Sequence, residues 1–434
     1  MVNVWAPYQA RVCRLLGRSS LYQSGGAVGF RDQLQDSVNL MLLSAAPARR
    51  QILECCRHQY REGDVQHWWH RHPDGDRGLR SRCSDNLLWL VWALCEYCAA
   101  TGDLKLCAVR EPWLASPPLR EDERDRYETA AQTEERAPVL EHAYAALERC
   151  VRRGFGPHAL PRIGSGDWND GLDRVEGESV WLGWFLSCCA GRFAELLDGL
   201  GDRRAARLRT LGEQVGRAAE ATFDGRWYPR AWTADGRVLG SGESIDALAQ
   251  SWAAFCPWAD RAHAESALDC ALALLVDRER RIVRLLDPPY TPENSPGYLS
   301  GYGKGFRENG GQYTHAAIWL ALAALRLGRR SEGTELLRML LPETHDIARY
   351  EAEPFVLPAD VCAAEGREGL AGWTWYTGSA GWLYRVITEE LLGLRLKDGK
   401  LYAKPGTLAH YRVLRRGEDG SEREIVRQTG HHEG

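Results

Sequence analysis

Apolar residues along most of the chain recur with the spacing of α-helices. The pattern predicts helices over 47–61, 85–101, 138–153, 179–199, 203–223, 243–256, 259–276, 315–328, 331–341 and 371–392. Two segments, 86–98 and 179–191, are apolar nearly all round, which indicates helices covered on both sides. We expect Ser84 and Asp85 to cap the start of one helix, and Thr-Gly-Asp at 101–103 to end it.

Four long stretches between the predicted helices are rich in glycine. They carry most of the histidines, tryptophans and paired charges, and they cover 18–36, 62–84, 155–178 and 285–313. No alternation of strands with helices is visible. Many buried helices in consecutive pairs, separated by long loops, indicate an all-α fold: a closed helical toroid with its functional loops at one end.

The pattern changes near residue 393. The next residues alternate around an Asp398-Gly399 turn, as expected for a β-hairpin. The last twenty residues, 415–434, are polar and are expected to form a frayed tail. We therefore divide the chain into a helical domain, 1–392, and a short C-terminal β segment with a polar tail, 393–434.

Composition excludes several classes of protein. The 434 residues carry a net charge of −4 spread over both signs, so nothing indicates a nucleic-acid or membrane-surface partner. No secretory signal and no bilayer-length apolar run is visible, and we expect a cytoplasmic protein. The 13 cysteines fit no zinc pattern and are expected to be reduced core thiols. Tryptophan outnumbers phenylalanine, 17 to 8, and such an excess is usual in carbohydrate sites, although most of these rings belong to the core.

One loop, residues 164–171, reads GSGDWNDG and places two carboxylates around an indole. A calcium loop would need glycine where Leu172 stands. An ordinary Asp-rich turn remains open, as does a catalytic acid. A carboxylic acid donates a proton at neutral pH when apolar surroundings or a like charge raise its pKa, and Asp170 has Trp168 and Asp167 nearby in sequence.

Four further stretches gather polar side chains. Residues 297–319 place Arg307, Glu308, Asn309, Gln312 and His315 in a glycine-punctuated loop that enters a helix, which favours a site over a solvated loop. Residues 22–36 place Arg31, Asp32 and Asp36 after a Gly-Gly loop, and 63–85 hold His67, Trp68, Trp69 and His70. The His-x-x-His spacing matches no zinc template, so we expect no metal. Thr-Gly-Ser at 377–379 could offer backbone N–H groups to an anion where a helix starts, although such turns are common.

Together these stretches resemble the cellobiose and chitobiose phosphorylase family, glycoside hydrolase family 94, and most closely its relatives at the C-terminus of cyclic β-1,2-glucan synthases. The motifs occur in the family's order from about residue 1 to 392: YQSGGAVGFRDQLQD, EGDVQHWWH, SDNLLWL, GSGDWNDG, GESVWLGWFL, RENGGQYTHAAIW and WYTGSAGW. The set is highly specific, although any single member would be modest evidence.

The resemblance implies an (α/α)6 barrel that holds a β-glucoside between a general acid and inorganic phosphate, with no other cofactor. Asp170 matches the general acid, and Trp168 lines the sugar site. The family's remaining positions imply phosphate contacts at Arg31, His315, Thr377 and Gly378, and substrate contacts at Asp36, Arg307, Glu308 and Gln312. Phosphate is itself a nucleophile, so a phosphorylase replaces the base and water of an inverting hydrolase with a cationic, donor-rich pocket.

Three departures from the family pattern stand out. The relatives carry an N-terminal β-sandwich and a helical linker before the barrel, and their C-terminal β-domain is reduced here to some forty residues. Asn86 stands where an acid is common, and we expect it to tune a subsite. The first two departures raise the possibility of a homodimer or of a larger multidomain polypeptide.

We expect an inverting glycoside phosphorylase that cleaves β-1,2-glucan, or a β-linked glucose disaccharide, to α-glucose 1-phosphate. Two alternatives stay open: an inverting hydrolase on the same barrel, and a non-catalytic carbohydrate-binding domain. Dependence of turnover on phosphate distinguishes the phosphorylase from the hydrolase, and binding of oligosaccharide without turnover identifies the binding domain.

Overall fold

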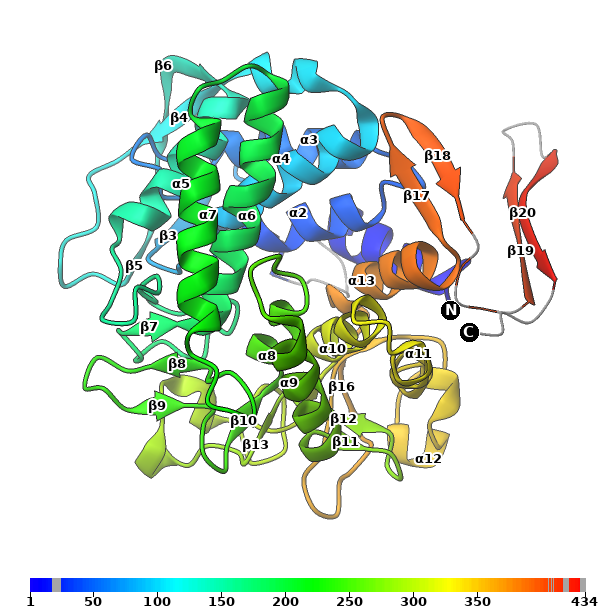
Figure 1. The fold of residues 1–434 in the computed structure, drawn as a ribbon. Coiled ribbons are helices and arrows are strands. Elements are labelled where there is room, and N and C mark those ends of the chain that lie inside the picture. The colour runs from blue at the N-terminus through cyan, green and yellow to red at the C-terminus, as the bar shows by residue number, and fades with distance from the viewer. Residues whose placement is uncertain (18–24, 405, 407, 409, 417–420, 430–434) are drawn as a thin grey trace.

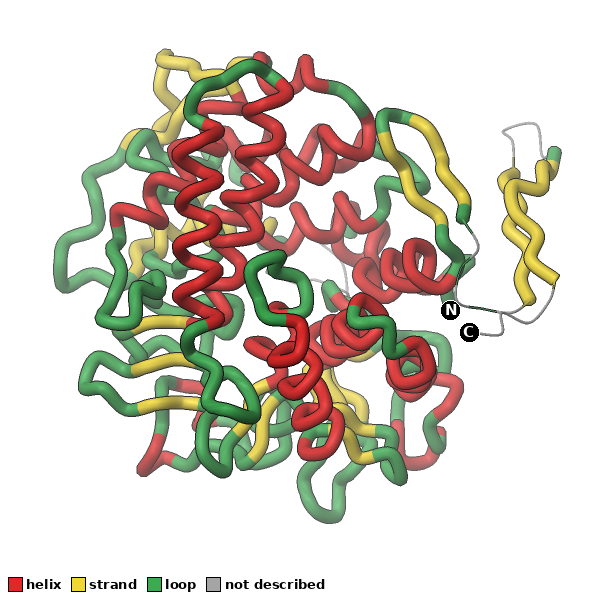
Figure 2. Tube along the Cα trace, viewed as in Figure 1, coloured by secondary structure: helices red, strands yellow, loops and turns green. Residues whose placement is uncertain are grey.

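A computed structural model describes residues 1–17, 25–404, 406, 408, 410–416 and 421–429. Helices make up the body of the molecule, small strands lie among the loops on several sides of it, and the last two strands stand apart from it (Figure 2). The described chain therefore combines a helical core with several two- to four-stranded sheets. The expectation of an all-α fold is only partly right.

Six helices form a closed inner ring, in which each packs against the next and the last packs against the first (Figure 1). They are α2 (Phe30–Asn39), α4 (Leu88–Thr101), α6 (Val180–Gly199), α8 (Ala247–Ala253), α10 (Thr314–Arg326) and α13 (Ser379–Val386). A π-helical turn, η6 (Ile387–Leu391), continues α13.

Further helices pack outside this ring. They are α3 (Ala46–Arg57), α5 (Val139–Arg152), α7 (Ala205–Glu220), α9 (Arg261–Leu274) and α11 (Arg330–Met339). The N-terminal α1 (Trp5–Tyr8) and η1 (Gln9–Leu16) pack against α13 and α2. Short helical turns occur at η2 (Leu104–Ala108), η3 (Pro292–Asn294), η4 (Tyr298–Gly301), η5 (Pro342–Thr344) and α12 (Ile347–Tyr350).

The core lies inside the ring and is unusually aromatic. Trp89, Trp181, Trp252 and Trp319 come from four inner helices and contact one another at centroid distances of 5.2–6.3 Å. α6 is long and apolar enough to cross a membrane by length and composition, but 78% of its apolar window is buried inside the fold. An apolar helix surrounded by others on all sides is what the sequence pattern predicted.

Short strands tie the loops together. One sheet joins β1 (Val28–Gly29), β2 (Gln66–His70), β3 (Arg77–Ser81) and β5 (Asp125–Thr129), and another joins β14 (Gln312–Tyr313), β15 (Pro358–Val361) and β16 (Ala371–Thr374). Among the smaller sheets, β4 (Arg110–Ala115) pairs with β6 (Ala131–Pro138), and β8 (Ala231–Trp232) lies between β7 (Glu178–Ser179) and β9 (Val238–Leu239). In two more, β10 (Ile245–Asp246) pairs with β13 (Leu286–Asp287), and β11 (Val276–Asp277) pairs with β12 (Ile282–Val283). β1, β7, β10 and β14 each run directly into an inner helix, so the sheets fix where those helices begin.

The C-terminal residues form two hairpins. In the first, β17 (Leu394–Lys397) pairs with β18 (Lys400–Ala403), and Asp398 and Gly399 both have positive φ, as a tight two-residue turn requires. In the second, β19 (His410–Arg416) pairs with β20 (Glu422–Thr429). Part of the tail that we expected to be frayed is therefore a strand, while 417–420 and 430–434 lie outside the described residues.

The helix predictions differ from the structure in several places, among them the N-terminal α1 and η1, which the pattern missed. The pattern missed α2, because nine of its ten residues are buried although most are polar. It also began the last helix at 371, where the structure has β16 and a loop before α13. α4 starts at Leu88 with no side-chain cap, because the predicted caps, Ser84 and Asp85, bond instead to Gly166 and Arg31; its end at Gly102 is as predicted.

Candidate active site

The predicted site residues lie at the end of the ring where the six inner helices begin, which we call the N-terminal end. Arg31 is in the first turn of α2, His315 is in the first turn of α10, and Gly378 directly precedes α13. Side-chain contacts connect neighbouring helix starts: Arg31 bonds to Asp85 before α4, and Arg230 bonds to Ser179 before α6 and lies 3.6 Å from Asp246 before α8. Helix starts expose unpaired N–H groups and the positive end of the helix dipole, so this end favours anions.

Asp170 is held by an arginine from a distant segment. The Arg31 guanidinium donates to Oδ1 of Asp170 at 2.8 Å, to Oδ1 of Asp85 at 2.8 Å and to the Asp167 carbonyl at 2.8 Å. Asp85 in turn accepts from the Trp89 indole at 2.9 Å, which ties Arg31 to the core. The Asp170 side chain is 41% exposed, whereas that of Arg31 is 8% exposed. Arg31 therefore fixes the Asp170 carboxyl from its buried side, and the rest of the carboxyl is open to solvent.

The other acid of the loop has a structural role. Asp167 is fully buried and accepts from Arg230 at 2.6 Å, from Ser179 at 2.8 Å and from the Asn169 N–H at 3.1 Å. Its charge is thus neutralised by Arg230 and is not a free like charge beside Asp170. The pairing anchors the loop to α6, since Ser179 is the N-cap of that helix.

Trp168 connects the acid loop to α10. It is 8% exposed, and its ring lies 5.3 Å from Tyr313, 5.5 Å from His315 and 5.4 Å from Trp319, each as a centroid distance. Edge-to-face contacts of this kind fix the ring plane. The indole therefore packs the acid loop against the start of α10.

His315, Thr377 and Gly378 lie together. A Cβ built on Gly378 would stand 3.3 Å from Nδ1 of His315 and 3.6 Å from Nη2 of Arg14, so this position needs glycine. Thr377 is 5% exposed, and its hydroxyl lies 2.8 Å from that of Ser379. Burial, together with Arg14 and Arg31, lowers the pKa of His315 to about 3 despite the opposing charge of Asp32. His315 is therefore neutral and contributes a hydrogen bond without a positive charge.

The positive charge beside His315 comes from Arg14, which the sequence analysis missed. Arg14 lies in η1, contacts Asp36 at 2.8 Å and Asp32 at 3.2 Å, and stacks over the Tyr376 ring at 4.3 Å. Its signal in the sequence is weak, since it is one basic residue in an amphipathic N-terminal segment. Only the contact with Gly378 reveals its place.

A second cluster surrounds Arg307. Nε of Arg307 lies 3.3 Å from Glu308, and Nη1 lies 3.6 Å from Asp360. Burial raises the pKa of Glu308, and the charges of Asp170 and Asp360 raise it further, whereas Arg307 lowers it. Glu308 and Asp170 are therefore near one another. Asp360, on β15, was another residue that the sequence did not reveal.

Three predicted residues have other surroundings than we expected. Asp36 is fully buried and bound to Arg14, so it positions that arginine instead of meeting a sugar directly. Gln312 is buried, accepts from the Val283 N–H at 2.9 Å and thereby joins β14 to β12, while its neighbour Tyr313 faces Trp168. Asn86 is fully buried, and its amide has no hydrogen-bond partner among the described residues.

Two groups have donors spaced for a metal ion. His67, Cys83 and Asp170 place one ligand atom each within 4.8 Å of one another, as do Glu54, His58 and Asp76. In the first group Arg31 already occupies Oδ1 of Asp170 and opposes a second cation there. Among the described cysteines all 13 are free thiols, and burial raises the pKa of Cys83 well above its usual value.

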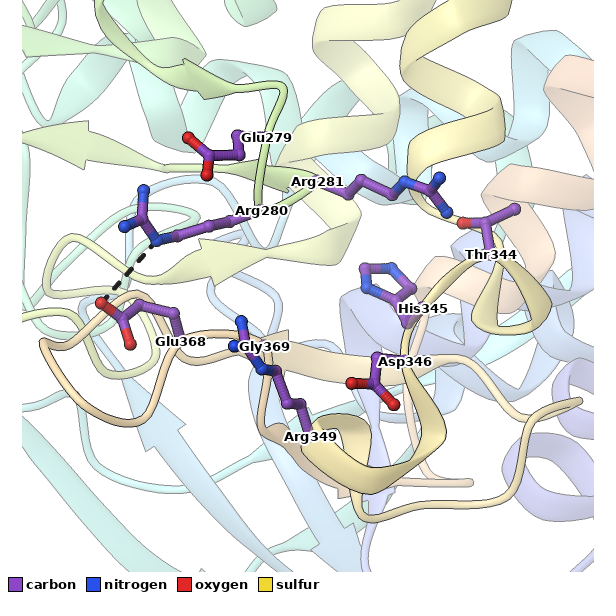
Figure 3. Close-up of a pocket in the computed structure, with 9 residues that line it drawn as sticks. All are labelled: Glu279, Arg280, Arg281, Thr344, His345, Asp346, Arg349, Glu368 and Gly369. Atoms are coloured by element: carbon purple, nitrogen blue, oxygen red, sulfur yellow. Dashed lines mark ion pairs between the residues drawn. The ribbon is translucent and has the colours of Figure 1, made fainter.

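A separate pocket of about 360 Å³ lies between the β11–β12 turn and α12 (Figure 3). Its lining mixes Arg280, Arg281 and Arg349 with Glu279, Asp346 and Glu368, and Arg280 pairs with Glu368 at 3.8 Å. None of the predicted site residues lines this pocket. We therefore do not place the reaction there.

The family model described as "Glycosyl hydrolase 94 superfamily, catalytic domain" matches residues 1–393. The chain is 42% identical over 421 residues to a cyclic beta-(1,2)-glucan synthase of Rhizobium meliloti, covering 93% of this chain and 15% of that protein. It is 28% identical over 413 residues to solabiose phosphorylase of Paenibacillus borealis, covering 91% of this chain and 49% of that protein. The chain thus spans half or less of these relatives.

Among solved structures, a GH78 family rhamnosidase of Bacillus is similar with a TM-score of 0.62 at 13% identity, over 96% of this chain and 38% of the other. This likeness concerns the fold alone. The sequence match carries the assignment, because it covers nearly all of the helical part and all the motifs at the N-terminal end of the ring. The chain belongs to the glycosyl hydrolase 94 superfamily, as a catalytic domain.

Proposed function

We propose that this domain is an inverting glycoside phosphorylase, which cleaves a β-linked glucose oligosaccharide with inorganic phosphate to give α-glucose 1-phosphate. One observation carries the proposal: Trp168, two residues before the half-exposed carboxyl of Asp170, contacts His315 of the buried group of anion donors at a centroid distance of 5.5 Å. Phosphorylase relatives support the reaction class.

The double layer of helices is, in this proposal, an (α/α)6 barrel. The closed inner ring and the helices packed outside it support that architecture. We assign residues 1–392 to the barrel and 393–434 to a shortened C-terminal β segment. The active end is the one to which six helix starts bring their positive dipole ends.

Asp170 acts as the general acid. Its protonated carboxyl donates to the glycosidic oxygen as the bond to the anomeric carbon breaks, so the departing sugar leaves as a neutral alcohol. Arg31 acts mainly on this carboxyl, since its donors point to Asp85, Asp167 and Asp170. We therefore revise its predicted role from phosphate contact to positioning of the acid.

Phosphate binds at the group formed by His315, Thr377 and Gly378. Arg14 supplies positive charge, neutral His315 supplies a hydrogen bond, and the N–H groups at the start of α13 add direction. A phosphate oxygen attacks the anomeric carbon from the face opposite the leaving oxygen, which inverts its configuration. No second carboxylate is needed as a base.

The substrate that we favour is β-1,2-linked glucan, because the relative at 42% identity is a synthase of that polymer. A β-linked glucose disaccharide is the smaller alternative. Trp168, Arg307 and Glu308 then contact the sugar. We also propose a cytoplasmic location, and assembly as a homodimer or within a longer polypeptide.

An inverting hydrolase is the competing function, and Glu308 gives it a candidate base. This carboxyl is 16% exposed, and its Oε2 has no hydrogen-bond partner among the described residues. Removal of phosphate separates the two reactions, because cleavage by water needs a base and no phosphate, whereas phosphorolysis stops without phosphate.

The test is a panel of β-linked glucose disaccharides and β-1,2-glucan, incubated in phosphate and analysed for α-glucose 1-phosphate by proton NMR. We expect product from at least one β-linked substrate. A panel that gives free glucose alone favours the hydrolase, and oligosaccharide binding without any product identifies a binding domain.

A further inference from the structure

An exposed and strained tryptophan stands beside Arg307. Trp373, on β16, is 63% exposed, the most exposed aromatic side chain among the described residues. Its φ is +50°, a conformation that is a genuine outlier for a bulky side chain. Strained backbone persists where the surroundings enforce it, and it clusters at functional sites. The structure therefore holds an indole in solvent at some energetic cost.

Trp373 is one end of a continuous row of rings and charge that we call the aromatic track. The Arg307 guanidinium lies 5.7 Å from the Trp373 ring and 5.3 Å from the Tyr302 ring. Tyr302 lies 6.3 Å from Tyr298, which is 49% exposed. The members of the track are Tyr298, Tyr302, Arg307 and Trp373.

The track begins on the acid side of the candidate site. The Leu299 N–H donates to the Gly171 carbonyl at 3.1 Å, and the Tyr298 N–H donates to Oδ1 of Asp173 at 2.9 Å. Tyr298 is therefore attached to the loop that carries Asp170. Since Asp170 protonates the departing oxygen, the track lies toward the departing part of the substrate and away from phosphate.

We propose that the aromatic track binds successive glucose residues of the departing chain, so that the domain prefers oligosaccharides longer than a disaccharide. The inference rests on the proposed function above. Aromatic rings pack against the C–H faces of sugars and bind hydroxyls at their polar edges. Each step along the track is about the size of one sugar ring, and Arg307 supplies fixed donors between two of the rings.

A glucan chain suits this surface better than a second protein does. The track is a narrow row that alternates rings with a cation and two nearby carboxylates, Glu308 and Asp360, and sugar hydroxyls can bond to these groups. The row is also continuous with the acid, as a substrate path must be. A protein interface of standard size would instead bury about 800 Å² on each partner through roughly 20–30 residues, far more than the four members of the track.

The experiment compares kcat/KM for β-1,2-linked glucose oligosaccharides, from the disaccharide to the hexasaccharide, in wild type and Trp373→Ala. We expect the preference for the tetrasaccharide over the disaccharide to fall about three- to tenfold in the variant. The matched control is Tyr402→Ala, which removes an exposed ring from the β17–β18 hairpin and should leave the ratio unchanged. Circular dichroism and thermal melting establish that each variant is folded.

A binding measurement keeps the test independent of turnover. In protein carrying Asp170→Asn, calorimetric titration with the tetrasaccharide should give a Kd that rises about three- to tenfold when Trp373→Ala is added. An unchanged chain-length preference together with an unchanged Kd overturns the track. A variant that loses only self-association on size-exclusion chromatography shows that Trp373 is a protein contact, which also overturns it. Absence of all turnover would count against the proposed function, and the titration would still decide the track.

Discussion

The two ends of the inner ring use the same charged residues in opposite ways. At the C-terminal end, where the helices finish, Arg192 and Arg385 both contact Glu96, and Arg385 also bonds to Glu389 at 2.9 Å. Arg326 bonds there to Glu390 at 2.9 Å. These pairs join α4 to α6, α4 to α13 and α10 to η6, and their residues line a cavity of about 130 Å³ at that end.

At the N-terminal end the charges come from long loops and are incompletely matched. Arg31 bonds to Asp170 across 139 residues of sequence, and Asp170 remains 41% exposed. Nε2 of His315 and Oε2 of Glu308 are buried without a hydrogen-bond partner among the described residues. Buried polar groups normally have hydrogen-bond partners, so we expect a ligand to supply the missing partners at this end. Nη1 of Arg385, at the C-terminal end, also lacks a hydrogen-bond partner among the described residues, so the partly exposed carboxyl of Asp170 is what distinguishes the N-terminal end.

The largest expected effect at the N-terminal end follows Asp170→Asn. The amide keeps the volume and can still accept from Arg31, but it has no proton to give to a departing oxygen. We expect turnover to fall by about 10²–10⁴-fold with an unchanged thermal melting curve. Steady-state rates on an oligosaccharide with a poor leaving group measure this. A near-wild-type rate would remove Asp170 from its role as the acid.

Asp167→Asn tests whether the neighbouring acid is structural. The change removes the charge of Asp167 from buried Arg230, whose other carboxylate, Asp246, lies at 3.6 Å, and breaking one side of a buried pair typically costs about 3–5 kcal/mol. Urea unfolding followed by fluorescence should show this loss of stability. A fully stable variant with strongly reduced turnover would instead give Asp167 a part in the reaction.

Glu96→Gln makes the corresponding change at the C-terminal end. Glu96 is largely buried and holds two arginines, so its loss should lower the free energy of unfolding by about 1–3 kcal/mol. Phosphorolysis by the folded variant should be unchanged, because no site residue lies at that end. Reduced turnover at a temperature where the variant is fully folded would show that the two ends are coupled.

The smallest effect concerns acid stability. Because the pKa of His315 is about 3 in the folded protein and near 6.5 when unfolded, the unfolded state binds more protons between these values. Stability is therefore lost as pH falls from 6.5 toward 3. In His315→Gln this contribution is absent, so between pH 7 and pH 5 the variant should lose about 2 kcal/mol less than wild type. Equal losses in denaturant titrations at the two pH values would mean that His315 is not neutral.

Much of the helical core could be predicted from the sequence, because apolar periodicity specifies buried helices such as α4 and α6 directly. The pattern missed α2, because Arg31, Gln35 and Asp36 are buried against polar partners and no apolar stripe marks the helix. The site loops were found from clustered polar residues and the family motifs. Arg14, Asp85 and Asp360 were not assigned to the site, because their importance arises only from contacts across the fold.

The reaction itself is tested most directly by the stoichiometry of cleavage under a phosphate titration. With the best substrate of the panel, the account predicts one α-glucose 1-phosphate for each glycosidic bond broken, and a rate that falls to zero as phosphate is removed. Cleavage at the same rate in phosphate-free buffer, with free glucose as the product, would contradict the account and assign the N-terminal end of the ring to a hydrolase.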